Sequence, residues 1–148
     1  MNLQKDLREF IELLNSKRVE YVVVGAHALA FHGHPRYTGD LDIFLRVSTE
    51  NAEKIIGTLT AFGFTDMELS EQDFLVDDNV IQLGVPPNRI DLLMSLTGIS
   101  FEEVWENRAS AKFGSVPVSV ISREHLIVNK RAVGRPQDLA DIALLSED

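Results

Sequence analysis

The sequence predicts an α/β (α+β) fold in which a mixed, partly antiparallel sheet of about four or five strands is flanked by helices. Two observations lead to this fold class. Apolar residues recur at helical spacing in several segments, and short β-branched or strictly alternating runs stand between those segments. The composition supports a folded chain, because 45% of the 148 residues are hydrophobic and only 25% are charged.

Apolar periodicity assigns the elements of the first half of the chain. Leucine, phenylalanine and isoleucine recur every three or four residues in the first segment, which predicts an amphipathic helix. A β-branched run then predicts a buried strand, an alanine-rich run a short helix, and strict alternation a second strand. A hydroxyl cap and a final glycine delimit the next helix. In order, these elements are a helix from Leu3 to Leu14, a strand from Tyr21 to Gly25, a helix from Ala26 to His32, a strand from Asp40 to Val47 and a helix from Ser48 or Thr49 to Gly63.

Turn and cap signals organise the second half. Two apolar runs joined through a Pro-Pro-Asn connection predict antiparallel strands, and a serine followed three residues later by glutamate predicts a capped helix. A proline in the next strand predicts that this strand lies at an edge of the sheet. In order, the elements are a helical turn from Ser70 to Phe74, strands from Val80 to Val85 and from Arg89 to Met94, a helix after Ser100, an edge strand from Val116 to Ile121 containing Pro117, and two helices separated by Gly134 that end near Leu145.

Composition excludes several classes of protein. The chain has 14 basic and 23 acidic residues, and the resulting charge of −9 argues against a broad nucleic-acid-binding surface. The absence of cysteine excludes disulfides, thiolate zinc sites and a cysteine nucleophile. No apolar run has the length of a membrane span and the N-terminus lacks a signal-peptide pattern, so we expect a cytoplasmic protein with no membrane partner. We expect one domain over residues 1–148, with a core at about 20–95 and a helical and strand extension at 96–148.

Three aspartates are the main candidates for chemistry. Asp40 and Asp42 stand at i and i+2 of a predicted strand, so their side chains share one face, with Cα atoms about 6.6 Å apart. Such a pair at the start of a strand is more often a solvated edge than a metal site. Asp91 favours the metal site, because it lies in an otherwise apolar strand where an unpaired charge is unfavourable. If the two strands are neighbours, three carboxylates converge into a site suited to Mg²⁺.

Gly25 is a further candidate, because it ends a strand immediately before a short helix. Backbone N–H groups at such a turn can bind a phosphate. Taken alone, the glycine is better explained by a tight turn. Its position 15 residues before the aspartate pair gives it functional interest.

The combined motifs resemble those of a known group of enzymes. Gly25-Ala26, thirteen residues, Asp40-Leu41-Asp42 and a later Ile90-Asp91-Leu92 follow the pattern of the nucleotidyltransferase superfamily that includes DNA polymerase beta. The resemblance is closest to the small bacterial AbiEii-type nucleotidyltransferases. It covers about residues 21–145 and rests on three runs: GAHALAFHGHPRYTGDLDIFL, RIDLLMSLTGISFEEVW and NKRAVGRPQDLADIALL.

This resemblance implies a reaction and roles for the aspartates. Asp40 and Asp42 would hold two Mg²⁺ ions, with Mn²⁺ as an alternative, and Asp91 would complete the first metal site. Asp91 would also be the candidate general base, since burial in an apolar strand raises a carboxyl pKa. An NTP would be the donor of a nucleoside monophosphate. Gly25 and Ala26 would bind its phosphates through their backbone N–H groups.

Basic residues of two other segments are candidate phosphate ligands. Arg36 precedes the aspartate pair by four residues, and its guanidinium can bind phosphate in a bidentate manner. In the resemblance, Lys130 would reach the triphosphate as a point charge. Arg135 is expected to pair with Asp138, and Asp141 is expected to be an acid on the surface of the last helix.

The acceptor and even catalysis itself stay open at this point. Ala26 stands where many members of the superfamily have glycine or serine, so the chain lacks a hydroxyl that could bond phosphate. One hypothesis is an enzyme that acts on a protein, an RNA end or a small molecule, in a toxin–antitoxin or phage-defence setting, with a partner protein or a homodimer supplying the acceptor surface. The alternative is a catalytically weak or inactive nucleotide-binding module that acts as a sensor or an antitoxin-like partner.

Overall fold

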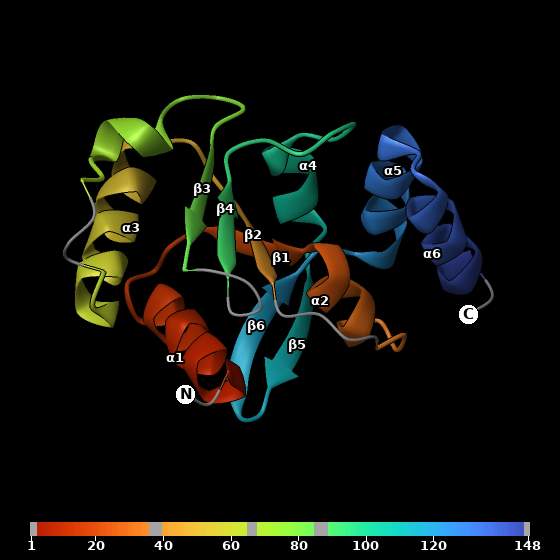
Figure 1. Cartoon of the computed structure of the whole chain (residues 1–148), viewed down its shortest axis with the longest axis horizontal. Coiled ribbons are helices and arrows are strands. Elements are labelled where there is room, and N and C mark those ends of the chain that lie inside the picture. Colours follow the sequence, from red (N-terminus) through yellow and green to blue (C-terminus); the bar gives the residue numbers. More distant parts are fainter. Residues whose placement is uncertain (1–2, 36–39, 65–67, 85–88, 147–148) are drawn as a thin grey trace.

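A six-stranded mixed sheet forms the centre of the computed structural model, which describes residues 3–35, 40–64, 68–84 and 89–146 (Figure 1). Its strand order is β3-β4-β2-β1-β6-β5. Strands β1 and β6 are parallel, as are β2 and β4, and the other neighbouring pairs are antiparallel. The strands are β1 (Tyr21–Val24), β2 (Leu41–Leu45), β3 (Val80–Leu83), β4 (Ile90–Leu93), β5 (Ala109–Phe113) and β6 (Val116–Val120). The predicted α/β class with a mixed sheet flanked by helices is therefore confirmed.

Helices cover the sheet in two groups. Figure 1 shows α1 and α3 together on one side of the molecule and the α5–α6 pair on the other. Phe10 of α1 packs edge-on against Phe62 of α3, with ring centroids 5.3 Å apart. The helices are α1 (Leu3–Ser16), α2 (Gly25–Phe31), α3 (Thr49–Phe62), the 3₁₀ turn η1 (Glu71–Phe74), α4 (Phe101–Glu106), α5 (Arg123–Val133) and α6 (Pro136–Ser146). None of the helices in these described ranges has the length and apolarity needed to cross a membrane.

Two predictions about the sheet are wrong. The sheet has six strands instead of four or five, because the segment of β5, Ala-Ser-Ala-Lys-Phe, carries no β-branched residue and gives little strand signal. The strand with Pro117 is β6, which lies between β1 and β5 and is not an edge. Proline is tolerated at position 117 because β1 pairs only with the last residue of β6, where Val23 lies opposite Val120. The carbonyl of Pro117 instead accepts a hydrogen bond of 2.7 Å from Asn15 Nδ2.

Local signals fix the elements that carry the site. Ser48 Oγ accepts a hydrogen bond from the Asn51 N–H at the start of α3, and Gly63 ends this helix with a φ of 109°. The side chain of Asn51 is only 3% exposed. It accepts from the Glu20 N–H and donates to the carbonyls of Glu20 and Arg46, so it ties the start of β1 to the end of β2.

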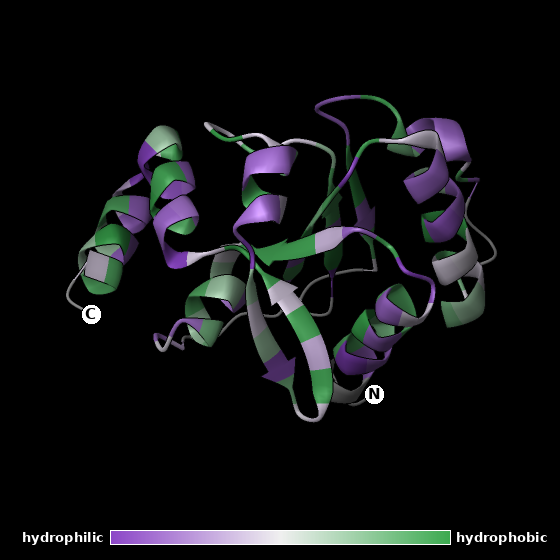
Figure 2. Cartoon of the chain, turned by 180° about the vertical axis from the view of Figure 1, so that it is seen from behind, coloured by the Kyte–Doolittle hydropathy of each residue, from purple (hydrophilic) through white to green (hydrophobic). Residues whose placement is uncertain are grey.

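Alternating burial shows how strands face the core. Figure 2 shows β6 in alternating green and pale bands, in agreement with the burial of Val116, Val118 and Val120. In β1 all four residues are buried, and in β4 the first three are buried, Asp91 among them. A carboxylate at such a position needs a charged or hydrogen-bonding partner.

Candidate active site

The aspartates meet in the middle of the sheet because β4 lies parallel to β2. The register places Asp42 opposite Asp91, with Val24 of β1 opposite Asp42 on the other side. Asp40 precedes Asp42 by two residues and so continues the same face of the chain. Asp91 is 8% exposed. The neighbouring strands on which the three-carboxylate prediction depended are therefore present.

Arg89 links two of the three carboxylates. Its Nε donates a hydrogen bond of 2.7 Å to Asp91 Oδ1, and one terminal nitrogen donates to Asp91 Oδ2 at 3.1 Å and to Asp40 Oδ2 at 3.2 Å. This arginine is the residue that sequence reasoning missed. The signal was its spacing, because residues 89 and 91 are two apart along an extended chain and share one face of the sheet.

The carboxyl of Asp42 is a weaker acid than that of an ordinary aspartate. Burial, followed by the nearby carboxyls of Asp91 and Asp40, raises the pKa of Asp42 to about 7, and the charge of Arg89 only partly opposes this rise. Like charges crowded in a half-buried site disfavour full ionisation. The Asp42 carboxyl can therefore exchange a proton near neutral pH.

We expect this acidity to make the stability of the metal-free protein depend on pH. The unfolded chain releases the Asp42 proton near pH 4 and the folded chain releases it near pH 7, so the folded state binds more protons between these values. The contribution of Asp42 to the free energy of unfolding therefore falls as the pH rises from about 4 to about 7, by about 1–3 kcal/mol after allowance for solvent screening. Urea unfolding in EDTA across this range measures it, and Asp42→Asn should flatten the profile. An equal slope in the variant would contradict the assignment.

Gly25 lies directly against Asp42. A Cβ atom added at Gly25 would stand 2.3 Å from Asp42 Oδ2, and the glycine has a φ of +69°. Glycine is required at this position for two reasons, since side chains avoid this φ and no space exists for one. Gly25 begins α2, and the N-cap residue of this helix, Val24, makes no side-chain cap hydrogen bond. The first-turn N–H groups, that of Ala26 included, therefore receive no cap from the side chain of Val24.

A cavity of about 240 Å³ opens beside Asp42. The end of β1, the loop after β4 and the α5–α6 pair form its walls. Its lining contains both acidic and basic side chains. The acids are Asp42 and Asp138, and the bases are Lys130 and Arg135. The residues that line it are Val24, Gly25, Asp42, Leu93, Ser95, Leu96, Thr97, Asn129, Lys130, Val133, Arg135 and Asp138.

The structure bears differently on the predictions made for the basic residues and their acidic partners. Lys130 lines the cavity, and its Nζ lies 2.9 Å from Asp141 Oδ2. Arg135 pairs with Asp138 as predicted, with 2.7 Å between Nε and Oδ2. The prediction for Asp141 is wrong, because this residue is fully buried as the partner of Lys130 and does not lie on the helix surface. Arg36 lies outside the described residues.

The carboxylates fit a hard divalent cation if Arg89 moves. All three side chains offer oxygen donors, which Mg²⁺ prefers. Burial, followed by the carboxyls of Asp91 and Asp40, raises the pKa of Asp42, and a bound cation would favour its charged form. Arg89 now supplies part of the compensating charge through Asp40 and Asp91. Among the residues described, no three acidic or histidine side chains are arranged as a ready metal-binding group. A cation would therefore have to displace the guanidinium from the carboxylates.

A protein-family model with the description "Nucleotidyltransferase of unknown function (DUF6036)" matches residues 2–145. The search of curated proteins found no match. The structure is similar to that of the lincosamide antibiotic adenylyltransferase LnuA in its lincomycin-bound form, with a TM-score of 0.63 and 17% identity over 96% of this chain and 95% of that one.

Two other solved structures share the fold. A candidate nucleotidyltransferase from Thermotoga maritima, TM1012, has a TM-score of 0.65 and 18% identity over 97% of this chain and 92% of its own. An antigenic nucleotidyltransferase-like protein from Paracoccidioides brasiliensis has a TM-score of 0.58 and 18% identity over 97% of this chain and 74% of its own. At these identities the three structures establish the fold.

Proposed function

The chain belongs to the DUF6036 family of nucleotidyltransferases, and on this premise we propose that it transfers a nucleoside monophosphate from an NTP to an acceptor hydroxyl or phosphate, with Mg²⁺ as the metal. The observation that carries the proposal is the meeting of Asp42 and Asp91 on adjacent strands, with Asp40 on the same face and Gly25 against Asp42. Three carboxylates beside the first-turn backbone N–H groups of α2 would combine cation and phosphate binding in one place.

Each residue has a role in this reaction. Asp40, Asp42 and Asp91 would hold two Mg²⁺ ions, or Mn²⁺ in their place. The bound metal supplies activation of the acceptor oxygen and neutralisation of phosphate charge. The N–H groups of Gly25 and Ala26 would orient the phosphates of the NTP. Arg89 would release Asp40 and Asp91 when the cation enters, and in-line transfer would then release pyrophosphate.

The finer features of the function are also proposals. We place the chain near the AbiEii-type nucleotidyltransferases, which suggests a toxin–antitoxin or phage-defence setting, and we treat residues 1–148 as one domain. The acceptor is a protein, an RNA end or a small molecule. A cavity of about 240 Å³ leaves little room for an acceptor beside a nucleotide, which supports an acceptor site completed by a partner protein or a second copy.

A nucleotide sensor or antitoxin-like partner without transfer activity is the second candidate. Ala26 favours it, because alanine provides a backbone N–H but no hydroxyl for phosphate. The hydrogen bonds that Arg89 donates to Asp40 and Asp91 also favour it, since they compete with metal binding.

A thermal-shift titration with MgCl₂ and each NTP tests the shared site. We expect the melting temperature of the wild type to rise only when metal and nucleotide are both present. The double variant Asp40→Asn/Asp42→Asn should lose this rise. Asp77→Asn, which changes an exposed acid outside the cavity lining, is the matched control and should keep it. No response of the wild type to any NTP would contradict both candidate functions.

Label transfer then separates the two functions. The protein is incubated with α-³²P-labelled NTPs and cell extract, and the protein, RNA and small-molecule fractions are counted. Label that requires Asp40, Asp42 and Asp91 supports the transferase. Tight nucleotide binding without label transfer supports the sensor.

A further inference from the structure

Among the described residues that line the cavity, Lys130 and Arg135 are the two basic ones, and their environments differ sharply. Lys130 is 5% exposed, whereas 70% of the side chain of Arg135 is exposed. Lys130 lies in the last turn of α5, and Arg135 immediately precedes α6. A phosphate that enters from solvent would meet the exposed guanidinium of Arg135 before the buried ammonium of Lys130. The difference in burial therefore suggests different roles for the two residues.

The ammonium group of Lys130 lies close to two buried carboxylates. Its Nζ donates to Asp141 Oδ2 at 2.9 Å and lies 3.8 Å from Asp138 Oδ1. Asp138 and Asp141 are 2% and 0% exposed, and Gln137 adds a hydrogen bond to Asp141. Buried carboxylates require nearby positive charge, so moving Lys130 to an NTP would take the ammonium away from Asp141 and leave Asp138 with the Arg135 guanidinium.

Arg135 is held in place by one of these carboxylates. Asp138 accepts hydrogen bonds from its Nε at 2.7 Å, from a terminal nitrogen at 3.2 Å and from its backbone N–H at 3.1 Å. The backbone bond resembles one half of a capping box and fixes the first turn of α6. A guanidinium has five N–H donors, so the Asp138 contact leaves donors on the exposed side.

We propose that Arg135 binds the phosphates of the NTP and that Lys130 is a positioning residue, which acts through Asp138 and Asp141 to hold α6 and Arg135 at the cavity. This inference rests on the proposed nucleotidyl transfer and replaces the sequence-based role of Lys130. Lys130 anchors the helix from inside, and Arg135 extends from the anchored turn toward the ligand. The forked donor geometry of arginine suits phosphate oxygens.

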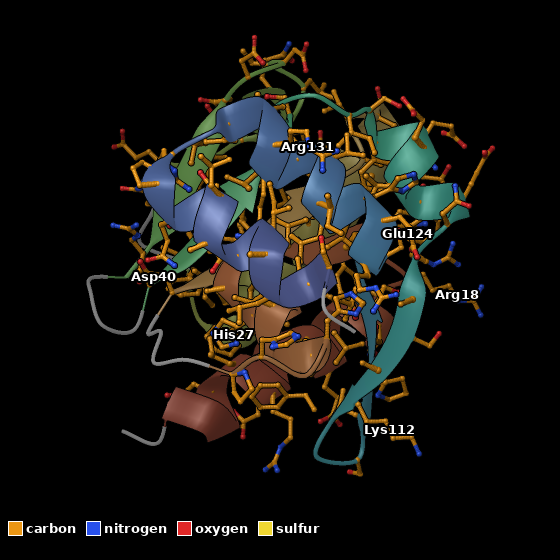
Figure 3. The ribbon with its side chains drawn as sticks, turned by 90° about the vertical axis from the view of Figure 1, so that its right-hand side faces the viewer. Arg18, His27, Asp40, Lys112, Glu124 and Arg131 are labelled. Carbon is orange, nitrogen blue, oxygen red and sulfur yellow. The ribbon has the colours of Figure 1, made fainter. Side chains whose placement is uncertain are left out.

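The first test changes the exposed cation. Isothermal titration with Mg²⁺ and NTP should show a dissociation constant about tenfold or more higher for Arg135→Gln than for the wild type. Arg135→Lys should recover only part of this loss, because it retains the charge and lacks the fork. Arg131→Gln is the matched control, since Arg131 is exposed on α5, lies outside the cavity lining and is distant from Asp40 in Figure 3. Unchanged affinity in Arg135→Gln would overturn the proposal.

The second test separates anchoring by Lys130 from direct binding. Lys130→Met should lower the melting temperature by about 10 °C, because it removes the ammonium that pairs with the buried Asp141 and lies near the buried Asp138. Lys130→Met/Asp141→Leu replaces the buried pair by apolar side chains and should recover most of that loss, with NTP affinity within about twofold of the wild type. A double variant that is stable but binds NTP weakly would show direct phosphate contact by Lys130 and overturn the proposal.

Failure of the inference is distinguishable from failure of the proposed function. If the wild type binds NTP, and Arg135→Gln binds it equally well, the inference fails and the function stands. If the wild type binds no NTP with Mg²⁺ present, the proposed function fails. The melting temperatures of the two Lys130 variants still test the anchoring role in that case, because they need no ligand.

Discussion

Asp42→Asn is expected to lower the rate of Mg²⁺-dependent label transfer on the order of a thousandfold. The amide keeps the size of the carboxyl and removes the charge that would bind the cation. It leaves Asp91 and Asp40 in place on the same face of the sheet. Initial rates at saturating NTP and Mg²⁺ measure the effect. Asp77→Asn, an exposed acid whose loss leaves the three carboxylates intact, should retain the wild-type rate.

The same substitution should not weaken the fold. Burial, followed by the carboxyls of Asp91 and Asp40, raises the pKa of Asp42 to about 7, so above that pH a neutral side chain removes a buried charge and its repulsion with those carboxyls. At pH 8 in EDTA, the free energy of unfolding of Asp42→Asn should equal or exceed that of the wild type. Lost transfer in a fully folded variant supports a chemical role. A variant that is stable and transfers at the wild-type rate would exclude Asp42 from the reaction.

Gly25→Ala is expected to have the second large effect, on stability and activity together. The new Cβ would stand 2.3 Å from Asp42 Oδ2, so the carboxyl or the turn must move, and alanine also resists a φ of +69°. We expect a loss of about 2–4 kcal/mol in the free energy of unfolding and at least about tenfold in transfer. Urea unfolding and initial rates on the same samples measure the two effects.

Gly114→Ala separates the backbone effect from the contact with Asp42. Gly114 has a φ of +65°, nearly that of Gly25, but among the described residues a Cβ there would meet only the side chain of Arg8, with Nη1 at 3.4 Å and Cδ at 3.5 Å. This control should lose about 1 kcal/mol of stability through its backbone alone and keep its activity. Equal losses in both variants would mean that the contact with Asp42 has no influence on the site.

Local signals made most of the fold predictable. The cap at Ser48, the left-handed glycine at Gly63 and the alternation in β2 depend on neighbours in the sequence, and they identified α3 and β2 closely. The segment of β5 escaped prediction, because its small and polar residues become a strand only by pairing with β6. The interior place of β6 depends on its partial overlap with β1, which no local pattern records.

The candidate site also has features that the sequence could predict and features that it could not. The placement of Asp42 beside Asp91 was predictable, because a charge in an apolar strand requires a partner and the resemblance suggested where it lies. The bridging contact of Arg89 depends on the positions of three side chains at once. The burial of Asp141 was missed because acids on a helix are normally assigned to solvent. This assignment fails when a lysine from another helix neutralises the acid.

The inner position of β6 gives the chain an order of assembly during synthesis. The part of the chain from α1 to β4 leaves the ribosome first and already contains Gly25 and the three aspartates. One edge of β1 stays uncovered until residue 120 has emerged, and the cavity lacks its cationic wall until α5 and α6 follow. N-terminal parts of a chain fold first as they emerge, so a nascent chain presents its acidic residues well before it can enclose a triphosphate.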